Sequence, residues 1–171
     1  VDVFDSLLEE TLDNILSQNG LDRDAIRLEV TESAYTEKAD RVIQVVESLR
    51  KKGYTVEMDD FGTGYSSLNM LSSMPVDVLK MDRAFVRNIG RDDRDIQLVA
   101  LILGIAKNLK IPTVAEGVET EQQFAMLKKL GCALAQGYWF SRPLHHSEFE
   151  AEILEKMARD LPSDDTTPEK V

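Results

Sequence analysis

Cysteine and histidine are scarce in this sequence. Its 171 residues contain one cysteine, Cys132, and two histidines, His145 and His146. A single cysteine excludes an intrachain disulfide and is typical of proteins in a reducing compartment, so we expect a cytoplasmic protein. With two adjacent histidines, a His-based zinc site has little support. We therefore expect any metal site in this chain to use oxygen ligands.

The sequence also lacks a long apolar run, and we expect no signal peptide at its first residues. No stretch approaches the ~20 apolar residues of a membrane-spanning helix. The first residues, Val1-Asp-Val-Phe4, are not a basic segment followed by an apolar one. We therefore expect no membrane contact by this segment. The chain begins without a methionine, from which we expect a fragment or a processed chain.

Positive charge is in short supply. Lys and Arg number 20 against 31 Asp and Glu, so the formal net charge is −11. Such a surface repels nucleic-acid polymers, which excludes them as expected partners. If the ligand carries phosphate, the positive charge that meets it must come from metal ions or from a few specific lysines and arginines.

What the sequence does contain is a regular alternation of strand and helix patterns. We expect strands at residues 26–31, 54–59, 75–82, 112–116 and 133–136, and helices at 3–18, 37–52, 65–72, 96–109, 120–130 and from 147 onward. Residues 161–171 are polar and are predicted to form a disordered tail after a domain portion of residues 1–160. Alternation of this kind predicts a parallel sheet with right-handed crossovers.

The ends of the predicted strands distinguish two α/β folds, the doubly wound sheet and the (β/α)₈ barrel. Polar residues with possible functions end every strand: Glu29, Asp59-Asp60, Lys80, Glu116 and Gln136. A barrel builds its active site from the carboxyl ends of many strands, whereas a doubly wound sheet uses one switch point. We therefore predict a barrel. Because a complete barrel needs about 250 residues, this chain is expected to be a partial barrel with about five strands.

Asp59 and Asp60 are the most informative pair in the chain. Adjacent residues in a strand point to opposite faces, so both carboxylates serve one site only where the backbone bends. Gly62 and Gly64 permit a bend at the strand end. Two carboxylates this close require a shared proton or a bound cation, and we favour cations. A solvated turn remains the alternative, because Asp and Gly are common turn residues.

Five sequence motifs resemble the EAL domain family of bacterial phosphodiesterases. They are Leu28-Glu-Val-Thr-Glu-Ser33, Asp59-Asp-Phe-Gly-Thr-Gly-Tyr-Ser-Ser-Leu68, Leu79-Lys-Met-Asp-Arg-Ala-Phe-Val86, Ala115-Glu-Gly-Val-Glu-Thr120 and Gln136-Gly-Tyr-Trp-Phe-Ser-Arg-Pro143. The resemblance extends to about residue 155. It implies a modified (β/α)₈ barrel that hydrolyses cyclic di-GMP to linear pGpG.

The resemblance also implies a metal site. Glu29 is similar to a divalent-metal ligand of the family. Asp59 is similar to the carboxylate that bridges two Mg²⁺ or Mn²⁺ ions, and Asp60 to a ligand of the second ion. Glu116 is similar to a ligand of a metal or a water.

Further roles follow from the same resemblance. Lys80 is similar to the lysine that hydrogen-bonds the attacking water, so Lys80, Glu116 and Asp59 are the expected catalytic residues. Glu119 and Gln136 are similar to supporting groups in the network of water and metal. Glu32 is similar to the glutamate that steadies the loop after Asp60, which in the family couples substrate binding to dimerisation.

One part of the family pattern is missing. The family's Glu-Ala-Leu motif, with a metal-binding Glu and a nearby substrate-binding Arg, does not occur in the sequence, and neither does the family's metal-binding Asn. The substrate-binding residues of this chain are therefore unknown. A partial barrel would also expose apolar core and an open strand edge near Ile26, so we expect self-association or a homodimer.

Two other functions remain open. The chain could be a non-catalytic, cyclic di-GMP-binding or regulatory interaction module, since part of the metal site is missing. A third hypothesis is a different Mg²⁺-dependent barrel enzyme with an enolase-like set of carboxylates and a Lys base, which would act on a carboxylate substrate.

Overall fold

A computed structural model describes residues 7–62, 68–89 and 93–160. In chain order the elements are α1 (Leu8–Asn19), η1 (Arg23–Ala25), β1 (Arg27–Thr31), α2 (Glu32–Lys51), β2 (Thr55–Phe61), α3 (Leu68–Ser73), β3 (Val78–Met81), α4 (Arg83–Arg87), α5 (Asp93–Leu109), β4 (Thr113–Ala115), α6 (Glu121–Leu130), β5 (Leu134–Ala135) and α7 (His146–Asp160). They fall into two compact units, Val1–Phe140 and Ser141–Val171.

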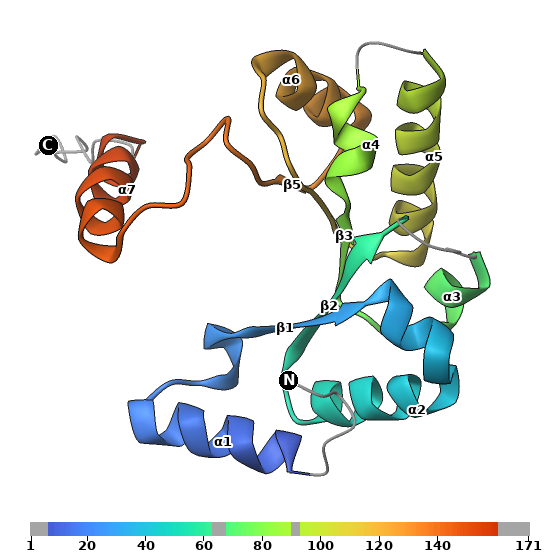
Figure 1. The fold of residues 1–171 in the computed structure, drawn as a ribbon, viewed down its shortest axis with the longest axis vertical. Coiled ribbons are helices and arrows are strands. Elements are labelled where there is room, and N and C mark those ends of the chain that lie inside the picture. The colour runs from blue at the N-terminus through green and yellow to red at the C-terminus, as the bar shows by residue number, and fades with distance from the viewer. Residues whose placement is uncertain (1–6, 63–67, 90–92, 161–171) are drawn as a thin grey trace, which may run out of the picture. The chain divides into compact units, whose positions relative to one another are not determined.

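The first unit is built on one parallel sheet. Its five strands lie in the order β1-β2-β3-β4-β5, and every neighbouring pair is parallel. Figure 1 shows how helices connect the successive strands. The predicted fold class, about five parallel strands with flanking helices, is therefore confirmed.

The inner strands β2, β3 and β4 are largely buried, because helices cover them. All four residues of β3 and all three of β4 are buried. In β2, Val56 and Met58 are fully buried. Strands of a parallel sheet are hydrophobic on both faces for this reason, and α2 packs on β1 and β2. A charged residue inside such a strand, such as Lys80, is consequently exceptional.

Several elements differ from the sequence-based expectation. The helix predicted to begin at residue 37 begins at Glu32, directly after β1, and has a non-helical residue at Lys38. Helix α4 was not predicted, because its five residues are too few to show a helical period. It begins after Asp82, whose Oδ1 accepts a hydrogen bond from the Ala84 amide at 2.8 Å. The predicted tail lies outside the described residues.

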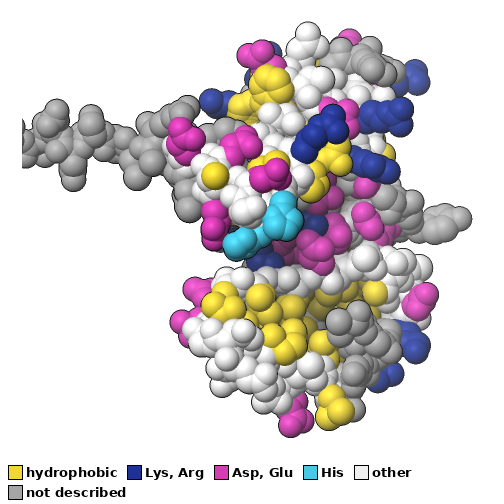
Figure 2. Space-filling view, turned by 60° about the vertical axis from the view of Figure 1, so that its left-hand side comes forward, with side chains coloured by type: hydrophobic (Ala, Val, Ile, Leu, Met, Phe, Trp, Pro, Cys, Tyr) yellow, Lys and Arg dark blue, Asp and Glu magenta, His cyan; other side chains and the backbone are white. Residues whose placement is uncertain are grey.

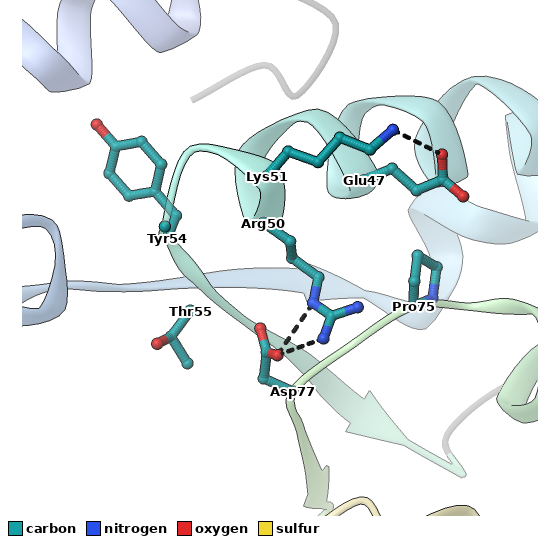
Figure 3. Close-up of a pocket in the computed structure, with 8 residues that line it drawn as sticks. Glu47, Arg50, Lys51, Tyr54, Thr55, Pro75 and Asp77 are labelled. Carbon is teal, nitrogen blue, oxygen red and sulfur yellow. Dashed lines mark hydrogen bonds and ion pairs between the residues drawn. The ribbon is translucent and has the colours of Figure 1, made fainter.

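The amino ends of β2 and β3 are tied together by Asp77 (Figure 3). The Asp77 amide donates to the Val56 carbonyl at 2.8 Å, and the Val56 amide donates to Asp77 Oδ2 at 2.9 Å. Arg50 at the end of α2 reaches Asp77 Oδ1 with Nε at 3.0 Å and Nη2 at 2.7 Å. These contacts join a helix and two strands at the amino ends of the strands. The candidate site lies at the opposite, carboxyl ends.

Candidate functional site

The carboxyl ends of neighbouring strands bring three carboxylates around one lysine. Lys80 Nζ in β3 lies 2.5 Å from Glu29 Oε1 in β1 and 3.0 Å from Asp59 Oδ1 in β2. It lies 2.9 Å from Glu116 Oε1, which directly follows β4. Residues separated by up to 87 positions thus meet, because the carboxyl ends of parallel strands lie on the same side of the sheet. We name these four residues the Lys80 cluster.

A β-bulge places Asp59 and Asp60 together opposite Lys80. Met58 pairs with Leu79 and Phe61 with Met81, so two residues of β2 oppose one residue of β3. The extra residue is accommodated by Asp60, whose φ of 54° is in the left-handed region. The sequence analysis placed the bend at the glycines after the strand. Asp60 already makes this bend, and Gly64 lies outside the described residues.

Lys80 is held in its charged form. Its burial lowers the pKa, but interactions with Glu116, Glu29 and Asp59 outweigh this effect, so the pKa of Lys80 lies above its ordinary value. Lys80 is therefore an ammonium near neutral pH, a donor of hydrogen bonds and not a base. The cluster still carries more negative than positive charge, because three carboxylates face one ammonium.

Asp60 adds to the negative charge of this region. Burial raises the pKa of its carboxyl, and the charges of Asp59 and Asp82 raise it further. Asp82 was missed in the sequence analysis. It lies two residues after Lys80, just past the end of β3 and within the same sequence motif. Asp82 therefore belongs to the electrostatic surroundings of the site, in addition to its contact at the start of α4.

The donor set suits a hard divalent cation, which prefers carboxylate oxygens. Asp59 Oδ1 is buried and makes no hydrogen bond of favourable geometry, although it lies 3.0 Å from Lys80 Nζ. This oxygen therefore retains capacity for a cation. Among the described residues, no three Asp, Glu, His or Cys side chains are arranged to enclose an ion, and the Lys80 ammonium lies among the carboxylates instead.

Glu32 contacts the backbone that follows the two aspartates. Its side chain is buried, and its Oε2 accepts a hydrogen bond from the Gly62 amide at 2.9 Å. A carboxylate of α2, which begins directly after β1, is thereby joined to the end of β2. This contact places Glu32 beside Gly62, and its predicted role in steadying the loop after Asp60 stays a prediction.

Glu119 lies just before α6, and Gln136 directly follows β5. The Glu119 amide donates to Gln123 Oε1 at 2.8 Å, near the start of α6, and the Glu119 side chain is exposed. Gln136 accepts from the Val118 amide with its backbone carbonyl at 3.0 Å, and its side chain is also exposed. Neither side chain has a recorded contact with the described members of the cluster.

The family model of the EAL domain matches residues 2–143. The chain belongs to the EAL domain family. It is 46% identical over 139 residues to the cyclic di-GMP phosphodiesterase NbdA of Pseudomonas aeruginosa, an alignment that covers 81% of this chain and 18% of that protein. The chain spans about a fifth of the length of the curated relatives that it matches first.

Solved EAL structures share the fold of this chain. A complex of the PaMucR phosphodiesterase with c-di-GMP has a TM-score of 0.80 and 37% identity, and the match covers 86% of this chain and 60% of that one. A manganese/cy-diGMP complex of Klebsiella pneumoniae BlrP1 has a TM-score of 0.76 and 35% identity, with coverage of 82% and 36%. Within the described residues of this EAL chain, no helix is both long and apolar enough to cross a membrane.

Proposed function

We propose that this EAL chain is part of an enzyme that hydrolyses cyclic di-GMP to linear pGpG with two divalent cations, Mg²⁺ or Mn²⁺. The observation that carries the proposal is the convergence of Glu29, Asp59 and Glu116 on Lys80 at one end of the sheet. Relatives that are cyclic di-GMP phosphodiesterases, and a neighbour complexed with manganese and cy-diGMP, support the same reaction.

Four carboxylates of this chain would hold the cations. Glu29, Asp59, Asp60 and Glu116 would be their ligands. The bulge at Asp60 supports this assignment, because it brings adjacent carboxylates to the same end of the sheet. Two bound divalent ions supply an activated water and neutralise the charge that develops at the phosphate.

Lys80 would orient the attacking water. Because it is charged, it can donate hydrogen bonds to a water and also offset the negative charge of the phosphate. Its burial in β3 fixes its position relative to Asp59 and Glu116. Lys80, Asp59 and Glu116 are thus the catalytic residues that we propose.

The remaining assignments concern the surroundings of the site and the whole protein. Glu119 and Gln136 would support the water and metal network once substrate and ions are bound, and Glu32 would hold the backbone after Asp60. Cyclic di-GMP is the proposed ligand, the cytoplasm the proposed location, and a homodimer the proposed assembly. Residues 1–160 would be the C-terminal portion of the barrel.

The decisive experiment is Asp59→Asn in a complete barrel that contains this chain. We expect pGpG formation to fall at least about a hundredfold, because the proposed metal site loses one negative charge and metal affinity with it. Asp22→Asn is the matched control, since Asp22 is exposed and lies before η1, away from the cluster. Unchanged turnover in Asp59→Asn would refute the metal assignment.

A second function has one observation in its favour. The Glu-Ala-Leu tripeptide does not occur in these 171 residues. By itself, the chain could therefore bind cyclic di-GMP or a partner without cleaving the nucleotide. Calorimetry with cyclic di-GMP, combined with product analysis, separates the two functions: heat of binding without pGpG supports the binding module, and pGpG supports the enzyme.

A further inference from the structure

We infer that Phe85 is a positioning residue that maintains the Asp59–Asp60 bulge through its contact with Gly62. The inference rests on the proposed function, because the bulge matters for catalysis only if these aspartates bind cations. Phe85 lies on α4, which follows β3, and its side chain is half-buried against the core. A phenyl ring has no acidic, basic or metal-ligating atom, so any effect of Phe85 on metal binding must be transmitted through the backbone that it touches.

The ring of Phe85 lies directly against Gly62. A Cβ atom built on Gly62 would overlap Cε2 and Cζ of Phe85, so a larger side chain fits at this position only if the Phe85 ring shifts. The φ of Gly62 is 99°, which also favours glycine. The requirement for glycine at position 62 therefore has two causes, the backbone conformation and the aromatic ring.

Gly62 is restrained by two different elements. Its amide donates to Glu32 Oε2 at 2.9 Å, which ties it to α2. The ring of Phe85, on α4, packs against the Cα atom of Gly62. The hydrogen bond alone would leave the peptide free to rotate about it, whereas the ring blocks movement toward α4. Together the two contacts hold the backbone two residues after Asp60.

This restraint matters because Asp60 has an unfavourable backbone conformation. A non-glycine residue with φ of 54° persists only where its surroundings enforce it. The ladder between β2 and β3 resumes at Phe61 and Met81, immediately after the bulge. Phe85 follows Lys80 in the same strand–helix segment. One segment therefore supplies both the ammonium of the cluster and the ring that fixes the opposing bulge.

The test uses the 171-residue chain and three substitutions: Phe85→Ala, Phe85→Leu and the control Phe124→Ala. Phe124 is also half-buried against the core, but it lies on α6 and packs edge-on to Phe140. For each variant we would measure Mn²⁺ affinity by calorimetry, exchange of the Gly62 amide by NMR, and stability in urea.

We expect Phe85→Ala to weaken Mn²⁺ binding about tenfold, the scale seen when a residue that orients metal ligands is removed. Exchange of the Gly62 amide should accelerate by a similar factor of about ten, because the hydrogen bond to Glu32 opens more often. Phe85→Leu should shift both values in the same direction by a smaller factor, since leucine fills part of the ring's volume. Phe124→Ala should lower stability and leave both values unchanged.

The inference is overturned if Phe85→Ala loses stability as Phe124→Ala does while Mn²⁺ affinity and Gly62 exchange stay at the wild-type values. If Phe85→Ala does not fold, Phe85→Leu decides in the same way. If the wild-type chain does not bind Mn²⁺, the proposed metal site fails for this chain. In that case the exchange rate of Gly62 still shows whether Phe85 restrains the bulge.

Discussion

At the scale of single residues, Lys80 is the side chain on which the strand ends depend. Its ammonium is buried and contacts three carboxylates from three other strand ends. Without this charge, Glu29, Asp59 and Glu116 would repel one another across the end of the sheet. A buried ion cluster of this kind adds little net stability to the fold. Its main effect is to let several carboxylates lie close together at the site.

We predict that Lys80→Met lowers the free energy of unfolding by about 3 kcal/mol, at the lower end of the range for breaking a buried ion pair. The lower end applies because Glu29 remains 48% exposed. Excess Mg²⁺ or Mn²⁺ should recover part of this loss, since a cation can replace the missing positive charge. Urea denaturation with and without the ion measures both effects.

The control for Lys80→Met is Lys128→Met, which removes an exposed lysine of α6. Its free energy of unfolding should stay within about 0.5 kcal/mol of the wild type, as for most surface substitutions. If the two variants lose equal stability, Lys80 does not hold the carboxylates together.

Among the helices and strands, side-chain hydrogen bonds join neighbouring elements at the amino ends of the strands, opposite to the candidate site. Asp77 bridges β3 to β2 through Val56 and is also contacted by Arg50 of α2. Helix α1 is joined to α2 because Glu9 accepts a hydrogen bond from Ser48 at 2.6 Å and pairs with Lys52. Of these contacts, those of Asp77 join β2 and β3, the strands that carry Asp59 and Lys80.

Substitutions of Asp77 and Arg50 should lower the free energy of unfolding by different amounts. We predict that Asp77→Ala destabilises by about 1–3 kcal/mol, because it leaves the buried Val56 amide without its carboxylate acceptor. Arg50→Ala should cost less than about 1 kcal/mol, since its ion pair is partly exposed to solvent. Chemical denaturation of the two variants gives the comparison. An equal loss would mean that the ion pair, and not the amide, accounts for the effect.

The contact between α1 and α2 should depend on pH. Hydrogen bonds from Lys52 and Ser48 hold the pKa of Glu9 below its ordinary value of 4.5. A lowered acid pKa stabilises the fold above pH 4.5, and the contribution disappears as the pH falls through the lower, folded-state pKa. Glu9→Gln should therefore cost about 0.5–1 kcal/mol near neutral pH and almost nothing in strong acid.

Urea denaturation of the wild type and of Glu9→Gln, near neutral pH and again in strong acid, measures how the loss of stability depends on pH. Glu10→Gln is the control, because Glu10 is exposed one residue further along the same helix. A Glu9→Gln loss that stays constant with pH would show that packing, and not charge, links α1 to α2.

At the scale of the whole molecule, the sheet has two edges within the described residues, at β1 and β5. Hydrophobic side chains gather on the lower part of the face drawn in Figure 2. Leu7, Ile15 and Leu21, within or beside α1, are exposed by 58%, 52% and 50%. An open strand edge and exposed apolar side chains both favour association between chains.

We predict that the 171-residue chain associates with itself as its concentration rises. Light scattering should give a mass above that of the monomer. Ile15→Lys should shift the equilibrium toward the monomer, because it places a charge among the exposed apolar side chains. Glu10→Lys on the same helix is the control for the change in net charge. A monomeric mass at every concentration would contradict the prediction.

Local signals in the sequence predict the order of the five strands and of the helices other than η1 and α4, because hydrophobic periodicity and the prolines and glycines at element ends need no distant contacts. The sequence also identified Glu29, Asp59, Lys80 and Glu116 as candidates, since each stands at or near a strand end and within a recognisable motif. The structure brings these four together. Their roles in metal binding and catalysis stay predictions.

How those residues meet depends on contacts that form in the folded chain. The bulge at Asp60 depends on pairing with β3, and the contact of Phe85 with Gly62 depends on the path of α4. The raised pKa of Lys80 requires carboxylates from three other strand ends. No local pattern in the sequence contains these facts, because each depends on residues that are distant along the chain and adjacent only once the parallel sheet has formed.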